Sequence, residues 1–373
     1  MKATENLIIS LYQKIINRAQ MKPEKFVAAF LVIFAAAIIF AIAAVWFVDP
    51  YIRYHRGFGL KEVYRQSEAM MPGVLRNFDF DTVLFGSSVC QNFDLDEINK
   101  ILHCRSVKAT TPGLESETLD KCLELVLKER KGEVKRCLIG ADLFCFSRNI
   151  SPRWKDYHYL YTDDIFIPEY FFSIDSAKAV GEVLESNIKP DKTARFRMME
   201  SKMFSNKPGI PYGKKYLEYG VTQLRENRSA MSDDCLTNFE NHLYRHIRNN
   251  PDVQFDIFLP PYSIYFWCFQ VELGELEKML EYRRRFAEGL QNLPNAVLHD
   301  FNADFSICSN LENFKDVSHY SPAVNTEILK KIHSGAVKCD FAQFIRNNES
   351  IRSETQKHQA EFDRLRSGAV QPR

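Results

Sequence analysis

The chain has 373 residues, enough for one large domain or two ordinary ones. Its 49 basic and 48 acidic residues leave it nearly neutral, so neither a basic nucleic-acid surface nor an acidic solvating tail is indicated, and we expect no nucleic-acid partner. The nine cysteines follow no spacing typical of a disulfide framework or a zinc site, and they mildly disfavour an oxidising compartment.

The uncharged segment 26–48 is the clearest feature of the N-terminal part. At ~1.5 Å per residue it would extend ~34 Å, enough to cross the ~30 Å hydrocarbon layer of a membrane. Its length exceeds that of a typical signal-peptide core, and its Ala-x-Ala matches lie inside the run rather than after it. We therefore predict a transmembrane helix over 26–48 that anchors the chain in the lipid bilayer, after a cytoplasmic N-terminal tail, 1–25. A cleaved signal peptide and a buried core helix are the alternatives.

Basic residues do not decide the orientation of this span, because four flank it on each side and the positive-inside rule needs an asymmetry. They are Lys14, Arg18, Lys22 and Lys25 before the span, and Arg53, Arg56, Lys61 and Arg65 after it.

After a juxtamembrane connector, 49–80, short apolar segments alternate with amphipathic ones. This alternation predicts an α/β domain, 81–340, with a parallel sheet that is covered by helices on both faces. The expected strands are 82–85, 106–109, 136–140, 254–259 and 296–301, and the expected helices are 95–102, 115–131, 236–248, 273–291 and 323–333.

The alternation breaks over an aromatic- and proline-rich insertion, about 145–234. A structureless loop of that length is unusual in a compact domain. We expect either a cap over the active edge of the sheet or a peripheral helical hairpin without a role in binding. The charged C-terminal tail, 341–373, is expected to be a solvated helix or disordered.

The segment Val83–Phe93, VLFGSSVCQNF, ends a buried strand in Gly86, Ser87 and Ser88. In parallel sheets, ligands bind beyond the carboxyl ends of the strands, where this turn lies. Asp142 follows the strand 136–140 and Tyr262 follows the strand 254–259, so both are expected at the same edge.

A serine becomes a useful nucleophile when a histidine takes its proton and a third group orients that histidine. Asp316 and His319, in KDVSHYSPAVN, are three residues apart, directly before the helix 323–333. At that spacing, a carboxylate can fold back within a loop or a helical turn and orient the imidazole.

The order of these blocks resembles the SGNH, or GDSL-type, hydrolase superfamily, across roughly 82–335. The resemblance implies a flavodoxin-like three-layer sandwich without a cofactor or a metal. It makes Ser88 the nucleophile, His319 the base and Asp316 the residue that orients it, with Ser87 in the place of the family aspartate. By the same resemblance, the backbone N–H groups of Gly113 and Ser88 are the expected oxyanion-hole donors.

The third family block, Gly-x-Asn, falls at Gly140-Ala141-Asp142, with Asp142 in place of the asparagine. An ionised carboxylate cannot donate a hydrogen bond to an oxyanion. Loss of one such donor can cost ~10²–10³ in rate. Asp142 therefore has another role, a different residue such as Asn149 donates, or the protein is slow or inactive.

The single N-terminal span and the Gly-Ser-Ser block are most similar to the membrane-anchored subset of this superfamily. That subset includes the D-alanyl transfer protein of teichoic-acid modification and the partners of membrane-bound O-acyltransferases. It implies an extracytoplasmic domain that acts as an acyl esterase or O-acyltransferase on a cell-surface polysaccharide, with a membrane-bound O-acyltransferase as a partner. The alternative is an inactive scaffold or glycan-binding subunit.

Other polar residues are interpreted structurally. His242 and His246 have a spacing that can hold a metal, but neighbouring Arg245 and Arg248 favour a solvated helix face. His299 is expected to be a structural histidine. Glu115 and Glu117 suit the start of their helix, where acidic side chains interact favourably with the helix dipole.

Overall fold

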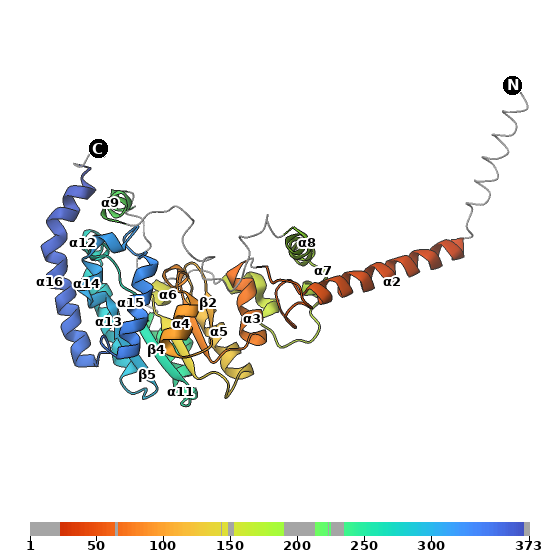
Figure 1. The fold of residues 1–373 in the computed structure, drawn as a ribbon, viewed down its shortest axis with the longest axis horizontal. Coiled ribbons are helices and arrows are strands. Elements are labelled where there is room, and N and C mark those ends of the chain that lie inside the picture. The colour runs from red at the N-terminus through yellow and green to blue at the C-terminus, as the bar shows by residue number, and fades with distance from the viewer. Residues whose placement is uncertain are drawn as a thin grey trace, which may run out of the picture.

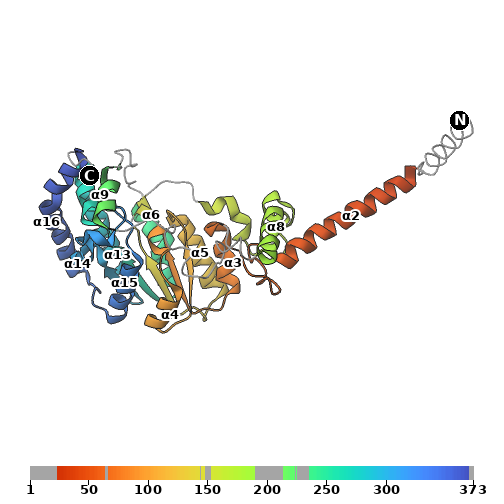
Figure 2. The ribbon, with the colours of Figure 1, turned by 45° about the horizontal axis from the view of Figure 1, so that its top comes forward.

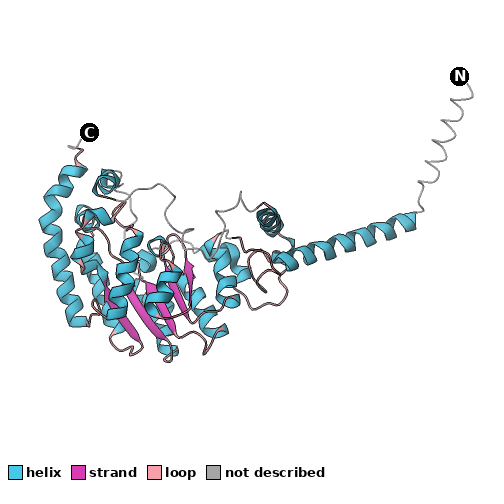
Figure 3. Cartoon of the chain, in the orientation of Figure 1, coloured by secondary structure: helices cyan, strands magenta, loops and turns pink. Residues whose placement is uncertain are grey.

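The computed structural model describes residues 23–63, 66–142, 144–147, 153–189, 213–222, 224 and 235–368. Its centre is a five-stranded sheet in which every strand pairs in parallel, in the order β2-β1-β3-β4-β5 (Figure 3). The strands are β1 (Thr82–Gly86), β2 (Ser106–Thr110), β3 (Arg136–Gly140), β4 (Gln254–Leu259) and β5 (Ala296–Asp300). The predicted α/β class with a parallel sheet is confirmed.

Buried strands explain this topology. Every residue of β1 and β2 is buried, as a parallel sheet with helices on both faces requires. Helices flank both faces of the sheet in Figures 1 and 2. They are α3 (Ser67–Asn77), α4 (Leu95–Leu102), α5 (Ser116–Glu129), α6 (Phe144–Ser147), α10 (Cys235–Phe239), α11 (Arg245–Asn249), α12 (Ile264–Glu272), α13 (Leu276–Leu290), α14 (Phe305–Cys308) and α15 (Pro322–Ser334). Short 3-10 turns are η1 (Ser88–Cys90), η6 (Phe301–Ala303) and η7 (Leu311–Asn313), and a π-helical turn, η5 (Glu240–Tyr244), joins α10 to α11.

The apolar N-terminal segment forms one continuous helix, α2 (Pro23–Val48), which projects away from the domain (Figure 1). It is long and apolar enough to cross a membrane, and none of its most apolar 18-residue window is buried. The alternative of a buried core helix is therefore wrong. Only Val45 and Val48, at its C-terminal end, are buried against the domain.

The connector 49–80 packs into the domain as part of its core. Asp49 adopts a left-handed conformation (φ 41°) directly after α2. Its carboxylate accepts hydrogen bonds from the backbone N–H groups of Arg53, Tyr54 and His55, and from the Tyr170 hydroxyl. Burial raises the pKa of Asp49, and these hydrogen bonds oppose the rise. The end of α2 is thus fastened to the domain at a closely hydrogen-bonded turn.

The part of the aromatic insertion from 153 to 189 lies away from the cavity. Its elements η2 (Arg153–Leu160), α7 (Pro168–Phe172) and α8 (Ile174–Ile188) pack on α2, α3 and one another, beside the end of the apolar helix (Figures 1 and 2). The expected cap over the active edge is therefore not formed by 153–189. A further helix, α9 (Lys214–Thr222), lies against the C-terminal helix, and the segments 190–212 and 225–234 are outside the described residues.

The charged segment after Asp340 is a helix, α16 (Phe341–Arg366), but it is not a solvated tail. It packs on α12 and α13 and buries Phe344, Ile351 and Phe362. The fully buried Arg283 of α13 donates hydrogen bonds to Asp300 (2.8 Å) and to Asn348 of α16 (2.8 Å). Long-range packing of a sparse apolar stripe thus makes α16 part of the domain.

Candidate active site

The turn after β1 owes its shape to two glycines that surround a buried thiol. A Cβ atom added at Gly86 would lie 2.6 Å from Cys90 Cβ, and one added at Gly140 would come well under 3.0 Å from Cys90 Sγ. Cys90 therefore fits only because both neighbouring strand ends lack a side chain. Burial raises the pKa of the Cys90 thiol, so this group stays protonated and acts as packing. Packing of Cys90 beneath the turn holds the short 3-10 helix that begins at Ser88.

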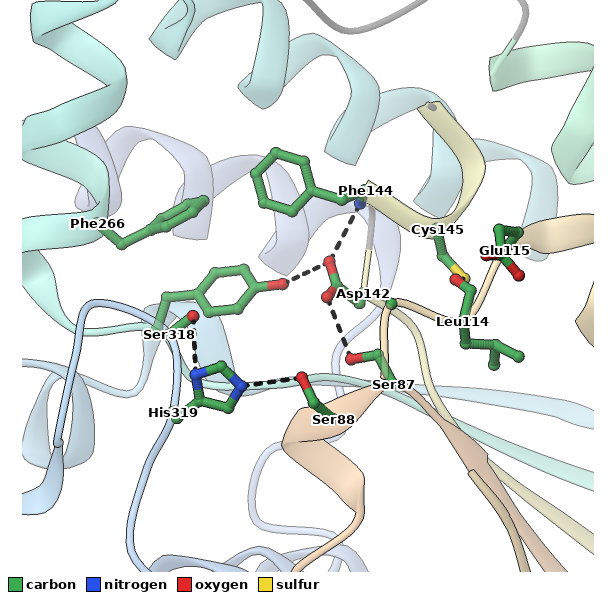
Figure 4. A pocket seen from close by; sticks show the side chains of 12 residues that line it. Ser87, Ser88, Leu114, Glu115, Asp142, Phe144, Cys145, Phe266, Ser318 and His319 are labelled. Carbon is green, nitrogen blue, oxygen red and sulfur yellow. Dashed lines mark hydrogen bonds between the residues drawn. The ribbon is translucent and has the colours of Figure 1, made fainter. Parts of the chain in front are cut away.

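Ser88, His319 and Asp316 form one continuous hydrogen-bonded chain. Figure 4 shows its first link, between Ser88 and His319. Ser88 Oγ lies 2.9 Å from His319 Nε2, although 231 positions separate the two residues in sequence. His319 Nδ1 lies 2.9 Å from Asp316 Oδ2 and 3.0 Å from Asp316 Oδ1. Since an ionised carboxylate can only accept, Nδ1 carries the proton and Nε2 faces the serine with its lone pair. This arrangement can take a proton from Ser88.

Asp316 stays ionised in this environment. Burial alone would raise its pKa. The hydrogen bond and charge of His319, together with the backbone N–H groups of Ser318 and His319, outweigh burial and lower the pKa of Asp316 to about 2. Those N–H groups lie 3.0 and 2.8 Å from Asp316 Oδ1. The loop before α15 thus fixes the carboxylate, and the carboxylate fixes the imidazole.

Gly113 and Ser88, the expected oxyanion-hole residues, both line the same cavity. Gly113 has a φ of 63°, and a Cβ there would meet no atom within 4 Å, so the glycine is needed for its conformation rather than for space. Within the described part of the chain, the N–H groups of Gly113 and Ser88 donate no hydrogen bond. Both residues line the cavity and are available to a ligand oxygen. The expected contribution of Asn149 lies outside the described residues.

Asp142 is held as a hydrogen-bond acceptor. It accepts from Tyr262 Oη (2.7 Å), the Phe144 backbone N–H (3.1 Å) and Ser87 Oγ (3.3 Å). Figure 4 shows the contacts with Phe144 and Ser87. The hydroxyl protons of Ser87 and Tyr262 are thereby directed to Asp142. Burial, followed by the charge of Asp142, raises the pKa of Tyr262 well above its usual range, so the phenol remains a donor. Asp142 therefore orders the neighbouring hydroxyls instead of donating itself.

A cavity of about 300 Å³ opens above Ser88. Five of the six predicted site residues line it, and Asp316 lies behind His319. The aromatic rings of Phe144, Tyr262 and Phe266 form one wall, with Tyr262 and Phe266 centred 4.3 Å apart. The full lining is Ser87, Ser88, Gly113, Leu114, Glu115, Asp142, Phe144, Cys145, Tyr262, Phe266, Ser318 and His319.

Sequence reasoning missed the wall formed by Phe144 and Phe266, although Tyr262 was placed at this edge by its position after β4. Glu115 also has a second role. It is the residue before α5, and its carboxylate accepts from Thr118 Oγ1 (2.9 Å), as expected at a helix start, yet it also lines the cavity. Phe144 follows the end of β3 by a few residues, which is the available signal, whereas Phe266 lies inside an apolar helix that resembles any core segment.

The solvated helix face expected at His242 and His246 is wrong. His246 is buried and contacts Asp120 (Nε2 to Oδ1, 2.6 Å), and His242 Nδ1 lies 2.9 Å from Ser116 Oγ. These side chains pack the helix onto α5. No group of three or more metal-binding side chains occurs in the part of the chain that the structure describes.

His299 also has a structural environment. It is buried within β5, and its Nε2 lies 3.2 Å from Asp256 Oδ1 on the neighbouring strand β4. It does not line the cavity.

No protein-family model matches the chain, and no curated protein matches it. A solved structure from Streptococcus pneumonia, provisionally described as a platelet activating factor, is similar at 12% sequence identity and a TM-score of 0.39. The alignment covers 73% of this chain and 91% of that one. This likeness is weak and supports no statement about activity.

Proposed function

We propose that this protein is a membrane-anchored, SGNH-like serine acyl esterase or O-acyltransferase that works through an acyl-enzyme on Ser88. The observation that carries the proposal is the chain of hydrogen bonds from Ser88 Oγ through His319 to Asp316, which ends in a cavity. The order of the sequence blocks and the geometry of the three side chains independently support Ser88 as the nucleophile, His319 as the base and Asp316 as the residue that orients it.

The chemistry follows from the protonation states. Ser88 Oγ attacks the carbonyl carbon of an acyl ester while its proton passes to His319 Nε2, and Asp316 stabilises the imidazolium that forms. In this proposal, the N–H groups of Gly113 and Ser88, which line the cavity, stabilise the oxyanion. The intermediate collapses, and the leaving alcohol takes the proton from His319. A sugar hydroxyl or water then attacks the acyl-enzyme by the reverse proton path.

The acceptor in this proposal is a cell-surface polysaccharide, and the domain is extracytoplasmic. The aromatic wall of Phe144, Tyr262 and Phe266 supports a glycan, because flat aromatic faces can pack against sugar rings beside the nucleophile. Location, and a membrane-bound O-acyltransferase as the partner, follow from the sequence resemblance and from the apolar helix α2.

A fluorophosphonate probe tests the nucleophile directly. The detergent-solubilised full-length protein is treated with the probe, and the labelled residue is located by mass spectrometry. We expect labelling at Ser88 that Ser88→Ala abolishes. Ser350→Ala, on the outer surface of α16, is the matched control and keeps full labelling. Labelling that persists in Ser88→Ala would remove Ser88 as the nucleophile.

A second candidate, a non-catalytic glycan-binding subunit, is favoured by Asp142, which stands in the place of an oxyanion donor and accepts three hydrogen bonds. This candidate predicts that the folded protein resists the probe but binds acylated polysaccharide through the same cavity. Tyr262→Ala would then reduce glycan binding measured by calorimetry, whereas Ser88→Ala would not.

A further inference from the structure

The part of the insertion from 153 to 189 ends in a helix, α8, with three distinct faces. Positions three or four apart share a face of an α-helix. One face of α8, which includes Ser176, Ala179 and Val183, is buried. A second face is charged and exposed. It consists of Asp175, Lys178, Glu182, Glu185 and Lys189.

The third face of α8 is apolar and uncovered. Ile174, Ala177, Gly181, Leu184 and Ile188 follow one another at steps of three, four, three and four residues, and all five are exposed. Ile174 and Ile188 are 73% and 75% exposed, comparable with side chains in the middle of α2 such as Phe40, at 75%. An ordinary soluble helix places such a stripe against the core.

Further exposed apolar side chains occur in α7, in the loop before it and near the end of α2, the elements around α8. Ile165, Phe166 and Phe172 surround α7 and are 90%, 52% and 50% exposed. Near the C-terminal end of α2, Phe47 stacks on Phe58, with ring centroids 5.5 Å apart, and both rings are largely exposed. We call these five residues, together with the α8 stripe, the apolar collar.

The apolar collar is fixed at the point where α2 meets the domain. Both α7 and α8 pack against α2, and Val183 of α8 forms a small cluster with Val48 and Val63. The Asn187 side chain bonds the backbone of Lys61 in both directions, at 2.8 and 3.1 Å. In Figures 1 and 2, α8 lies across the end of α2 rather than along it. A helix across a membrane span lies along the membrane surface.

We propose that the apolar collar is a membrane-surface contact, with α8 lying in the bilayer interface and its exposed stripe among the lipid acyl chains. Position at the end of the span selects lipid as the occupant, because Phe47 belongs to α2 and both α7 and α8 pack against α2. Amphipathic helices that lie in the interface bury such a stripe ~5–10 Å deep. The inference rests on α2 as the membrane span and is independent of the chemistry at Ser88.

The charged face of α8 indicates which lipid headgroups the proposed membrane contact requires. It carries three acidic and two basic side chains, so it offers no attraction to an anionic surface. The contact therefore depends on apolar insertion and forms on zwitterionic phosphatidylcholine. The domain then contacts the membrane at two places, the span and the apolar collar, so its orientation relative to the membrane is restricted.

Quenching in vesicles tests this contact. The full-length protein with Ile188→Cys is labelled with a fluorophore and reconstituted into phosphatidylcholine vesicles. The matched control is Glu185→Cys, on the charged face of the same helix, and the unsubstituted protein gives the background from native thiols. Nitroxide groups on the acyl chains probe lipid contact, and dissolved iodide probes water contact.

We expect nitroxide lipid to quench the Ile188 label several-fold more than the Glu185 label, and iodide to show the opposite order. Equal iodide quenching at the two positions would mean that the stripe faces water, and would overturn the proposal. A label at Ile188 that neither quencher reaches would mean that a second copy or a partner protein covers the stripe, which also overturns it.

Discussion

Cys90 packs between two strand ends that finish in Gly86 and Gly140. The predicted effects of adding a methyl group at these two glycines differ, because different atoms of Cys90 would be in the way. A Cβ at Gly140 would clash with Cys90 Sγ, and its next neighbour, Phe258 Cζ, is 3.0 Å away. A Cβ at Gly86 would clash with Sγ and would also lie 2.6 Å from Cys90 Cβ. Overpacking of this kind typically costs about 1–3 kcal/mol of unfolding free energy.

Removing the sulfur should rescue one glycine substitution but not the other. In a Cys90→Ala background, Gly140→Ala loses its severe clash, and we expect its cost to fall by about 1 kcal/mol or more. Gly86→Ala keeps the clash with Cβ, so its cost should remain. The turn that carries Ser88 lies directly above, and we also expect fluorophosphonate labelling to slow in both single glycine variants and to recover only for Gly140→Ala.

Urea unfolding in mild detergent, followed by tryptophan fluorescence, measures these free energies in a double-mutant cycle. Independent substitutions add within ~0.3–0.5 kcal/mol. Additivity of Gly140→Ala and Cys90→Ala within that margin would refute the packing argument. Equal rescue of both glycine variants would refute the distinction between Sγ and Cβ.

Two further predictions concern charged groups. Asp316→Asn should reduce the fluorophosphonate labelling rate by up to about 10⁴-fold, because His319 loses the carboxylate charge and an amide N–H facing Nδ1 would favour the wrong tautomer. The folded pKa of Asp316 is lowered to about 2, whereas the unfolded value is about 3.9. The stabilising contribution of this group is therefore complete above pH ~3.9 and is lost as the pH falls toward 2. The unfolding free energy of Asp316→Asn should depend less on pH over that window than that of the unsubstituted protein. Arg283→Met should cost about 3–5 kcal/mol in urea unfolding, because it leaves the fully buried Asp300 without its cationic partner and with only the Asn347 amide as a side-chain donor. A loss under about 1 kcal/mol would contradict this account.

Local patterns predicted the strands, the helices and the residue types of the site. The apolar runs before Gly86 and Asp142 identified two strand ends, and parallel pairing brings them to one edge of the sheet. The contact between Asp316 and His319 was a prediction from their spacing, because at three residues apart the carboxylate can fold back onto the imidazole, and the structure shows this contact. The apolar helix was predictable from length and composition alone.

The hydrogen bond between Ser88 and His319 depends on the whole sheet, since 231 positions separate the two residues in sequence. Tertiary structure also decided the roles of Cys90 and Phe266, which in sequence resemble any other buried residue. Periodicity states that a residue is apolar and which face of its helix it occupies, but it does not state which distant element covers that face.

The dependence on distant contacts also accounts for the two segments, 153–189 and α16, whose structure differs from the sequence prediction. The sequence by itself determined an α/β chain with an apolar N-terminal helix and a serine, a histidine and an aspartate in a suggestive order. Only the tertiary structure decided that 153–189 gathers at the end of α2 rather than over the cavity, and that α16 buries Phe344 and Ile351 in the domain. These outcomes depend on complementary surfaces far apart in the chain, and no local pattern encodes that complementarity.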